Sequence, residues 1–186
     1  MFLKMFSFFL RTVPTFLNKF TYKCFYNLLF HLLKMRRQVV LKNLKRAFPH
    51  KNQDWYNKIS SQCYKFYTKD FLEFLSFPRY FNHDKIKFKN IEILDDALKN
   101  NKGVLFVSGH FGAFDKLFYS LATRGYALCG VAYKQKDGVA DKFFKRIREN
   151  YMKKQLYKGG SSKELKVALN NNEILVLLSD QDAREK

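Results

Sequence analysis

Residues 103–115 read GVLFVSGHFGAFD, and this stretch decides the fold. It opens with a compact apolar run from Gly103 to Val107, which is typical of a buried strand. A turn with two glycines follows, and a helical pattern then extends from about Ala113 to Arg124. Open parallel sheets usually place their ligands beyond the carboxyl ends of the strands. The stretch therefore predicts a strand, a turn that carries a site, and a helix.

The segments around this stretch repeat the alternation of strand and helix. Three further strands are predicted, at Ile86 to Ile91, Ala127 to Tyr133 and Ile174 to Leu178. Three further helices are predicted, at Leu94 to Lys99, Val139 to Tyr151 and Ser162 to Leu169. Such alternation predicts an α/β fold, with a mostly parallel sheet covered by helices.

The first 80 residues have a different, helical texture. Two helices are predicted, from Arg37 to Phe48 and from about Trp55 to Phe77, and each ends at a proline. The segment Phe2 to Leu33 is amphipathic, and its longest stretch without Lys or Arg, Cys24 to Leu33, falls well short of the ~20 residues of a spanning helix. We expect it to lie in a membrane interface. The alternative is an amphipathic helix packed on the protein's own core.

Charge and composition restrict the partners. The 186 residues include 35 Lys and Arg against 16 Asp and Glu, a net charge of +19, and the first acidic residue is Asp54. An anionic partner is implied. Because the basic stretch is interleaved with Phe and Leu, it favours a membrane surface over nucleic acid. The three cysteines are scattered, which suggests a reducing compartment and no metal site, and we predict neither a metal nor a cofactor.

The turn after the central strand holds His110, and Asp115 follows five residues later. On one regular helix the two side chains would lie about 140° apart, but they can meet across a turn made by Gly109 and Gly112. A His with a carboxylate on its second ring nitrogen can remove the proton of an attacking hydroxyl group. The alternative, for the pair alone, is a structural histidine that caps the turn.

The residues that flank the pair resemble a known family. Gly109-His110-Phe111-Gly112 with Phe114-Asp115 resembles the H-x4-[DE] motif of the lysophospholipid acyltransferase superfamily, in particular its lipid A biosynthesis branch (lauroyl- and myristoyl-type acyltransferases). Further stretches that are similar to this branch are 35–49, a basic helix; Tyr133-Lys134; 141–149; the loop at Gly159-Gly160; and 179–182. Together these stretches cover nearly the whole chain.

The resemblance implies an enzyme of lipopolysaccharide or lipooligosaccharide biosynthesis. It would transfer a fatty acyl chain from acyl carrier protein to a hydroxyl group of a lipid A precursor, at the cytoplasmic face of the bacterial inner membrane. His110 would be the base and Asp115 its carboxylate. Because Arg and Lys suit phosphate oxygens, Lys134, Arg146 and Arg148 are candidates to hold phosphates of the acceptor or carrier; the alternative for each is a solvated basic helix face. Residues 1–48 would form a basic membrane-associating segment, and residues 49–186 an α/β acyltransferase domain.

Two departures from the family's pattern limit this interpretation. The branch usually has Asn-Trp-Glu where this chain has Ala113-Phe114-Asp115, and similar proteins continue beyond Lys186. We therefore expect a chain truncated at its C-terminus, with an unpaired edge on the strand at 174–178 and an incomplete acyl site. The alternatives are a glycerophospholipid acyltransferase, an inactive membrane-bound fragment and, least favoured, a nucleic acid binder.

Overall fold

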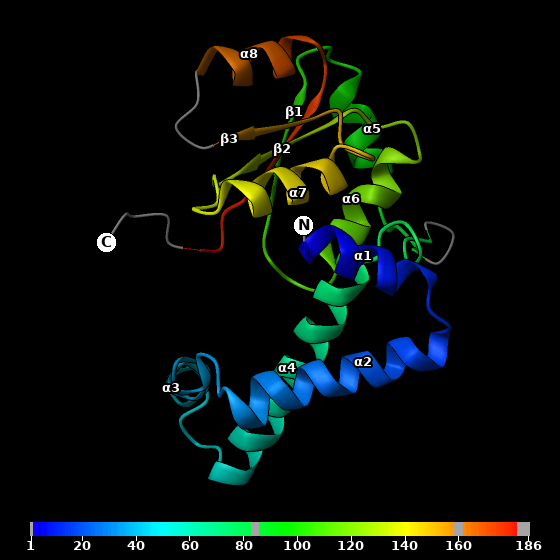
Figure 1. Ribbon diagram of the computed structural model, residues 1–186. Coiled ribbons are helices and arrows are strands. Elements are labelled where there is room, and N and C mark those ends of the chain that lie inside the picture. Colours follow the sequence, from blue (N-terminus) through cyan, green and yellow to red (C-terminus); the bar gives the residue numbers. More distant parts are fainter. Residues whose placement is uncertain (1, 83–85, 158–161, 182–186) are drawn as a thin grey trace. The chain divides into compact units, whose positions relative to one another are not determined.

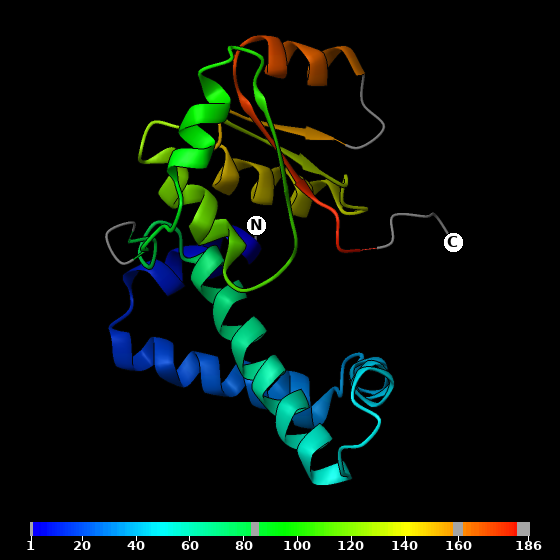
Figure 2. The ribbon, with the colours of Figure 1, turned by 180° about the vertical axis from the view of Figure 1, so that it is seen from behind.

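The computed structural model describes residues 2–82, 86–157 and 162–181. The chain forms two compact units, one of residues 4–78 and one that begins at Arg79 (Figures 1 and 2). The first unit is helical, and the second contains the sheet. Residue 48, the predicted end of the membrane-associating segment, lies between two helices of the first unit.

The first unit is helical, as the sequence pattern predicts, but the segment 2–33 forms two α-helices and not a single one. The helices are α1 (Phe2–Thr12), α2 (Thr15–Asn27), which continues into a π-helical turn (Leu28–Leu32), α3 (Arg37–Ala47) and α4 (Gln53–Leu75). Pro14, at the N-cap of α2, separates the first two because its ring removes a backbone donor. Asn52 caps α4, where its side-chain oxygen accepts a hydrogen bond from the Trp55 backbone N–H at 2.9 Å.

The interior of the first unit contains polar side chains bonded to backbone. Ser7 donates to the Leu75 carbonyl oxygen at 2.6 Å, and the Asn18 amide donates to the Leu10 carbonyl oxygen at 2.9 Å. Both polar side chains are buried, whereas several phenylalanines of α1 and α2 are exposed. This distribution is the reverse of an ordinary water-facing helix.

The second unit is built on a four-stranded parallel sheet in the order β1-β4-β2-β3. Its strands are β1 (Val104–Ser108), β2 (Leu128–Ala132), β3 (Lys154–Tyr157) and β4 (Ile174–Leu178). The predicted α/β fold with a parallel sheet is therefore confirmed. Because β4 pairs with β1 on one side and β2 on the other, the expectation of an unpaired edge at 174–178 is wrong.

Helices cover both faces of this sheet, and they are α5 (Glu92–Leu98), α6 (Phe114–Ala122), α7 (Gly138–Arg148) and α8 (Ser162–Asn170). On one face Ala168 of α8 packs with Cys129, Leu156 and Leu175. On the other face the Phe106 ring contacts Phe118 of α6, with 6.2 Å between ring centroids. Figures 1 and 2 show α7 and α8 on opposite sides of the strands.

Two local predictions differ from the structure. Residues 86–91 form no strand, although burial alternates there between Ile86, Lys87 and Phe88. The alternation reflects packing, since the Phe88 ring lies 4.5 Å from the Arg124 guanidinium, but a strand also needs a hydrogen-bonded neighbour. Strand β3 was not predicted, because Lys153 and Lys154 hide its short apolar pattern; it is an edge strand, where lysine is common.

Candidate active site

His110 lies in the loop that follows β1, two residues beyond the end of that strand. The loop then passes Gly112, whose φ of +65° is a left-handed conformation that glycine adopts without strain, and enters α6 at Phe114. The Phe114 ring meets the imidazole edge-to-face, with ring centroids 5.2 Å apart. The position of His110 is thus fixed by the end of β1, the turn and the start of α6. This is the arrangement that the sequence of residues 103–115 predicts.

A carboxylate from the neighbouring strand end reaches the His110 ring. Asp180 follows β4, and its Oδ1 lies 2.9 Å from His110 Nδ1. The two loops are joined at their base, where the Ser179 N–H donates to the Ser108 carbonyl oxygen at 2.9 Å. Hydrogen bonds from the His110 side chain and backbone N–H hold the pKa of Asp180 below its usual range, so this carboxylate is ionised at neutral pH.

Asp115 occupies a different position, in the buried first turn of α6. Its Oδ1 accepts a hydrogen bond from the Tyr151 hydroxyl at 2.7 Å and one from Arg148 Nε at 3.2 Å. Burial, followed by the Asp115 charge, raises the pKa of Tyr151 well above its usual value, so the tyrosine stays a donor. Asp115 therefore ties α6 to the end of α7.

A cavity of about 560 Å³ lies on the α6–α7 side of the sheet. His110, Asp115 and Arg148 are all in its wall. The rest of the wall is mainly apolar and aromatic, and includes Phe114, Phe118, Tyr133, Phe144, Met152, Val176 and Leu178. Gly130 forms part of the sheet floor, where a Cβ atom would lie 2.8 Å from the Met152 sulfur. A mainly apolar cavity with several polar groups in its wall suits a ligand that has an alkyl part and a reactive head.

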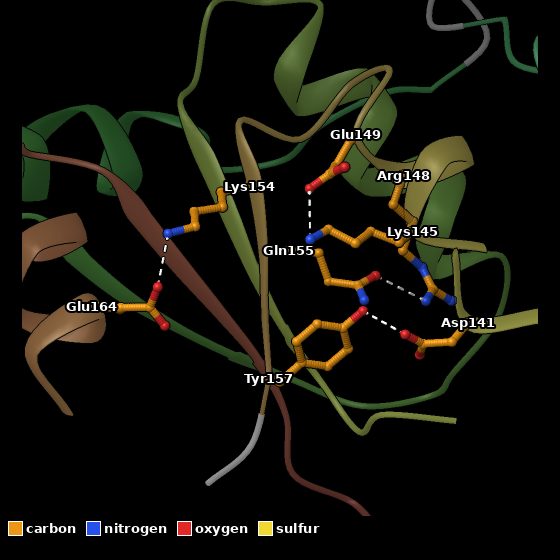
Figure 3. Close-up of polar contacts among 8 residues, drawn as sticks. All are labelled: Asp141, Lys145, Arg148, Glu149, Lys154, Gln155, Tyr157 and Glu164. Carbon is orange, nitrogen blue, oxygen red and sulfur yellow. Dashed lines mark hydrogen bonds and ion pairs between the residues drawn. The ribbon is translucent and has the colours of Figure 1, made fainter. Parts of the chain in front are cut away.

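Further polar contacts hold α7 against the sheet (Figure 3). Arg148 Nη1 donates to the Gln155 side-chain oxygen at 3.5 Å, and the Tyr157 hydroxyl donates to Asp141 Oδ2 at 2.6 Å. The Gln135 backbone N–H donates to the other carboxylate oxygen of Asp141, and these hydrogen bonds lower the pKa of Asp141. The cavity wall along α7 is thus fixed by charge-assisted contacts.

The comparison of this chain with protein families decides its class. The profile of the bacterial lipid A biosynthesis acyltransferase family matches residues 2–186, essentially the whole chain. The chain belongs to this family. A search of the curated proteins finds no match. Family membership makes the chain an acyltransferase of lipid A biosynthesis with a lipid A-type acceptor, and the resemblance seen in the sequence is confirmed.

The structure brings together three of the five residues that the sequence singled out in this lipid A acyltransferase. His110, Asp115 and Arg148 share the cavity wall, while Lys134 and Arg146 are exposed and are not among its lining residues. The predicted contact between Asp115 and the His110 ring is replaced by the contact with Asp180. The reason is geometric: the first turn of α6 directs its buried side toward Arg148 and Tyr151, while β4 ends next to β1.

Sequence reasoning missed the contact between Asp180 and His110. Asp180 was noted only as part of the stretch 179–182 that is similar to the family, although its place just beyond a buried strand is the signal that identified His110. Among the described residues, no group of three or more His, Cys, Asp or Glu side chains could hold a metal ion. No helix of the described segments is both long and apolar enough to span a membrane.

Proposed function

We propose that this chain moves a fatty acyl group from the thioester of an acyl carrier protein to a hydroxyl group of a lipid A precursor, with His110 as general base. We further propose that it acts at the cytoplasmic face of the bacterial inner membrane. The observation that carries the chemistry is the position of His110, which is held by a carboxylate through Nδ1 and lines an apolar cavity.

The reaction follows from the base. With Nδ1 bonded to a carboxylate, Nε2 is the nitrogen that accepts the proton of the acceptor hydroxyl group as its oxygen attacks the thioester carbonyl carbon. The C–O bond forms, the C–S bond breaks, and the imidazolium returns the proton to the leaving thiolate. No covalent acyl-enzyme and no redox step is needed.

Arg148 supplies positive charge at the same cavity. Its guanidinium is tied to Asp115 through Nε, and its side chain is 26% exposed. A guanidinium has five N–H donors in a planar arrangement that suits phosphate oxygens, and the contacts with Asp115 and Gln155 fix the position of this one in the cavity wall. We propose that Arg148 holds a phosphate of the acceptor or carrier.

The acceptor class can be tested directly with the purified chain. Given labelled acyl carrier protein and an equimolar mixture of a lipid A precursor and a lysophospholipid, we expect label on the lipid A precursor in at least tenfold excess. The acceptors share an apolar tail and phosphate, so a preference reports recognition of the sugar part. Preferential labelling of the lysophospholipid would favour the glycerophospholipid alternative.

Exposed cations lie on α7 and on the loop that leads into it. Positions 141, 144 and 148 of α7 line the cavity, whereas Lys142 and Arg146 are exposed, as are Lys134 and Lys136 of the preceding loop. A carrier that delivers a thioester into this cavity would approach beside α7. We propose that this set of four cations, the α7 basic surface, binds an acidic acyl carrier protein, which steers association by charge.

Reversing two of these charges should weaken carrier binding selectively. For the double variant Lys142→Glu and Arg146→Glu, we expect KM for acyl carrier protein to rise about tenfold or more at low salt, with kcat nearly unchanged. KM for acyl coenzyme A should change much less. The matched control, Lys102→Glu with Lys166→Glu, makes the same charge change at exposed positions outside the cavity wall. Equal effects of the two double variants would refute a specific carrier surface.

We propose that the first unit binds an anionic membrane surface through α1 and α2. Exposed apolar side chains gather on α1 and α2, and Phe2, Phe8, Phe16 and Phe20 are each at least 65% exposed. Lys4, Arg11, Lys19 and Lys23 are exposed on the same two helices. Aromatic rings that enter a headgroup layer, next to cations that pair with anionic lipids, describe an interfacial helix.

Removing two of these rings should release the chain from vesicles. Phe16 and Phe20 are one helical turn apart on α2, and burying each ring in lipid contributes about 1.5 kcal/mol or more. We therefore expect Phe16→Ser with Phe20→Ser to weaken binding to phosphatidylglycerol vesicles roughly 100-fold in sedimentation assays. Ile93→Ser with Val167→Ser, at exposed apolar positions of the second unit, should bind normally. If both double variants bind equally well, α2 is not the anchor.

A further inference from the structure

We propose that Asp180, and not Asp115, is the positioning residue that orients His110 and fixes its tautomer. This inference rests on His110 as the proposed base. It assigns a role to a residue in the loop after β4 that the His110–Asp115 motif does not include. It also gives Asp115 a separate task, the placement of Arg148.

Backbone pairing alone places the two loops side by side. Strands β1 and β4 are neighbours, and Ser108 pairs in register with Leu178, so both chains leave the sheet at the same level. The hydrogen bond from the Ser179 N–H to the Ser108 carbonyl oxygen extends the pairing by one residue. The backbone of Asp180 is therefore held beside the loop that carries His110.

The contact itself selects one imidazole tautomer. Because an ionised carboxylate only accepts hydrogen bonds, the 2.9 Å contact between Asp180 Oδ1 and His110 Nδ1 requires the proton on Nδ1. Nε2 then has the lone pair that general base catalysis needs. The same carboxylate accepts a hydrogen bond from the His110 backbone N–H, so it holds both the ring and the loop.

Gly109 makes room for this carboxylate. A Cβ atom on residue 109 would lie 3.2 Å from Asp180 Cγ and 3.3 Å from Asp180 Cβ, closer than most real contacts of this kind. Any larger residue at 109 would therefore displace the Asp180 side chain by at least a few tenths of an ångström. A glycine at position 109 therefore leaves the space that the Asp180 carboxylate occupies beside His110.

Asp115 is committed elsewhere. Its carboxylate is buried, and the Tyr151 hydroxyl and Arg148 Nε both donate to the same oxygen, Oδ1. To orient the His110 ring, it would have to give up contacts that join α6 to α7. The two carboxylates therefore have different roles: Asp180 orients the imidazole of His110, and Asp115 holds the guanidinium of Arg148.

The test uses ¹⁵N NMR of the full chain labelled in histidine, together with steady-state kinetics. In the wild-type chain we expect a protonated Nδ1 and an unprotonated Nε2 for neutral His110. Asp180→Asn should shift the tautomer signals and lower kcat with little change in KM. Removing an orienting carboxylate has cost about 10⁴-fold in a buried triad; because Asp180 is 43% exposed and water can partly replace it, we expect on the order of 10²-fold.

Three comparisons keep the result specific. Asp115→Asn should leave the His110 tautomer signals unchanged, and Gly109→Ala should shift them in the same direction as Asp180→Asn. Asp180→Glu, which keeps the carboxylate, should restore part of kcat. The proposal is overturned if Asp180→Asn leaves the tautomer and kcat unchanged, or if Asp115→Asn is the variant that shifts the tautomer. If His110→Ala retains activity, the proposed base is wrong, and the tautomer signals still decide whether Asp180 orients the ring.

Discussion

His110→Ala is expected to lower kcat/KM by about 10²- to 10⁴-fold, because it removes the group that takes the proton from the acceptor hydroxyl. The fold should survive the change. The His110 side chain is about one-third exposed and belongs to a loop, so its removal leaves no buried cavity. Circular dichroism and thermal unfolding should therefore be close to those of the wild-type chain, and vesicle binding should be unchanged.

His50→Ala is the matched control, because His50 is exposed, lies in a turn of the first unit and is outside the cavity wall. It should be fully active. A structural role for His110 would give a different pattern, in which His110→Ala unfolds at a much lower temperature and loses activity in proportion. Full activity of a folded His110→Ala variant would remove the catalytic assignment.

Asp115→Ala should reduce both stability and activity. The change leaves Arg148 without its buried carboxylate partner and removes the acceptor of the Tyr151 hydroxyl. Breaking a buried ion pair from one side typically costs about 3–5 kcal/mol, and because Arg148 is partly exposed we expect about 2–3 kcal/mol here. Urea unfolding gives this number, and we expect kcat/KM to fall at least tenfold because Arg148 is no longer fixed in the cavity.

Tyr151→Phe is the control that separates the two contacts of Asp115. It removes one hydrogen bond, worth about 1 kcal/mol, but keeps the ion pair with Arg148. We expect it to keep activity within a few-fold. If Tyr151→Phe loses as much activity as Asp115→Ala, the ion pair is not what the reaction needs.

Much of the fold follows from local patterns. The apolar runs at 104–108, 128–132 and 174–178 are strands because they are short, rich in Val, Ile and Leu and bounded by turn residues. The pattern is weaker at the margin of the sheet. Strand β3 was not predicted because Lys153 and Lys154 interrupt its short apolar pattern. The alternation at 86–91 was wrongly interpreted as a strand, because periodicity reports burial and not the presence of a hydrogen-bonded partner.

The candidate site was predictable as far as it is local. His110 could be identified because a His between two glycines follows a buried strand. Arg148 lies on a helix that the sequence predicted, and this helix lines the cavity. The partner of the imidazole was not predictable in this way. Asp180 lies 70 residues from His110 and meets it only because β4 is inserted between β1 and β2, an order that periodicity does not reveal.

The first unit shows the same limit. The sequence indicated amphipathic helices up to residue 77, and the structure has helices there. The pattern could not show that Ser7 and Asn18 would be buried while Phe16 and Phe20 stay exposed. This inversion depends on backbone carbonyl groups of Leu10 and Leu75 that accept the buried donors, which are contacts between separate elements of the unit.

The most direct test of the central claim is mass spectrometry of the lipid product. The purified chain would be incubated in detergent with an acyl carrier protein that bears an isotope-labelled acyl chain and with a lipid A precursor. We predict that the wild-type chain adds one labelled acyl chain in ester linkage, and that His110→Ala forms at most about one hundredth as much product. Absence of the labelled ester with the wild-type chain, or equal amounts with both chains, would contradict the account.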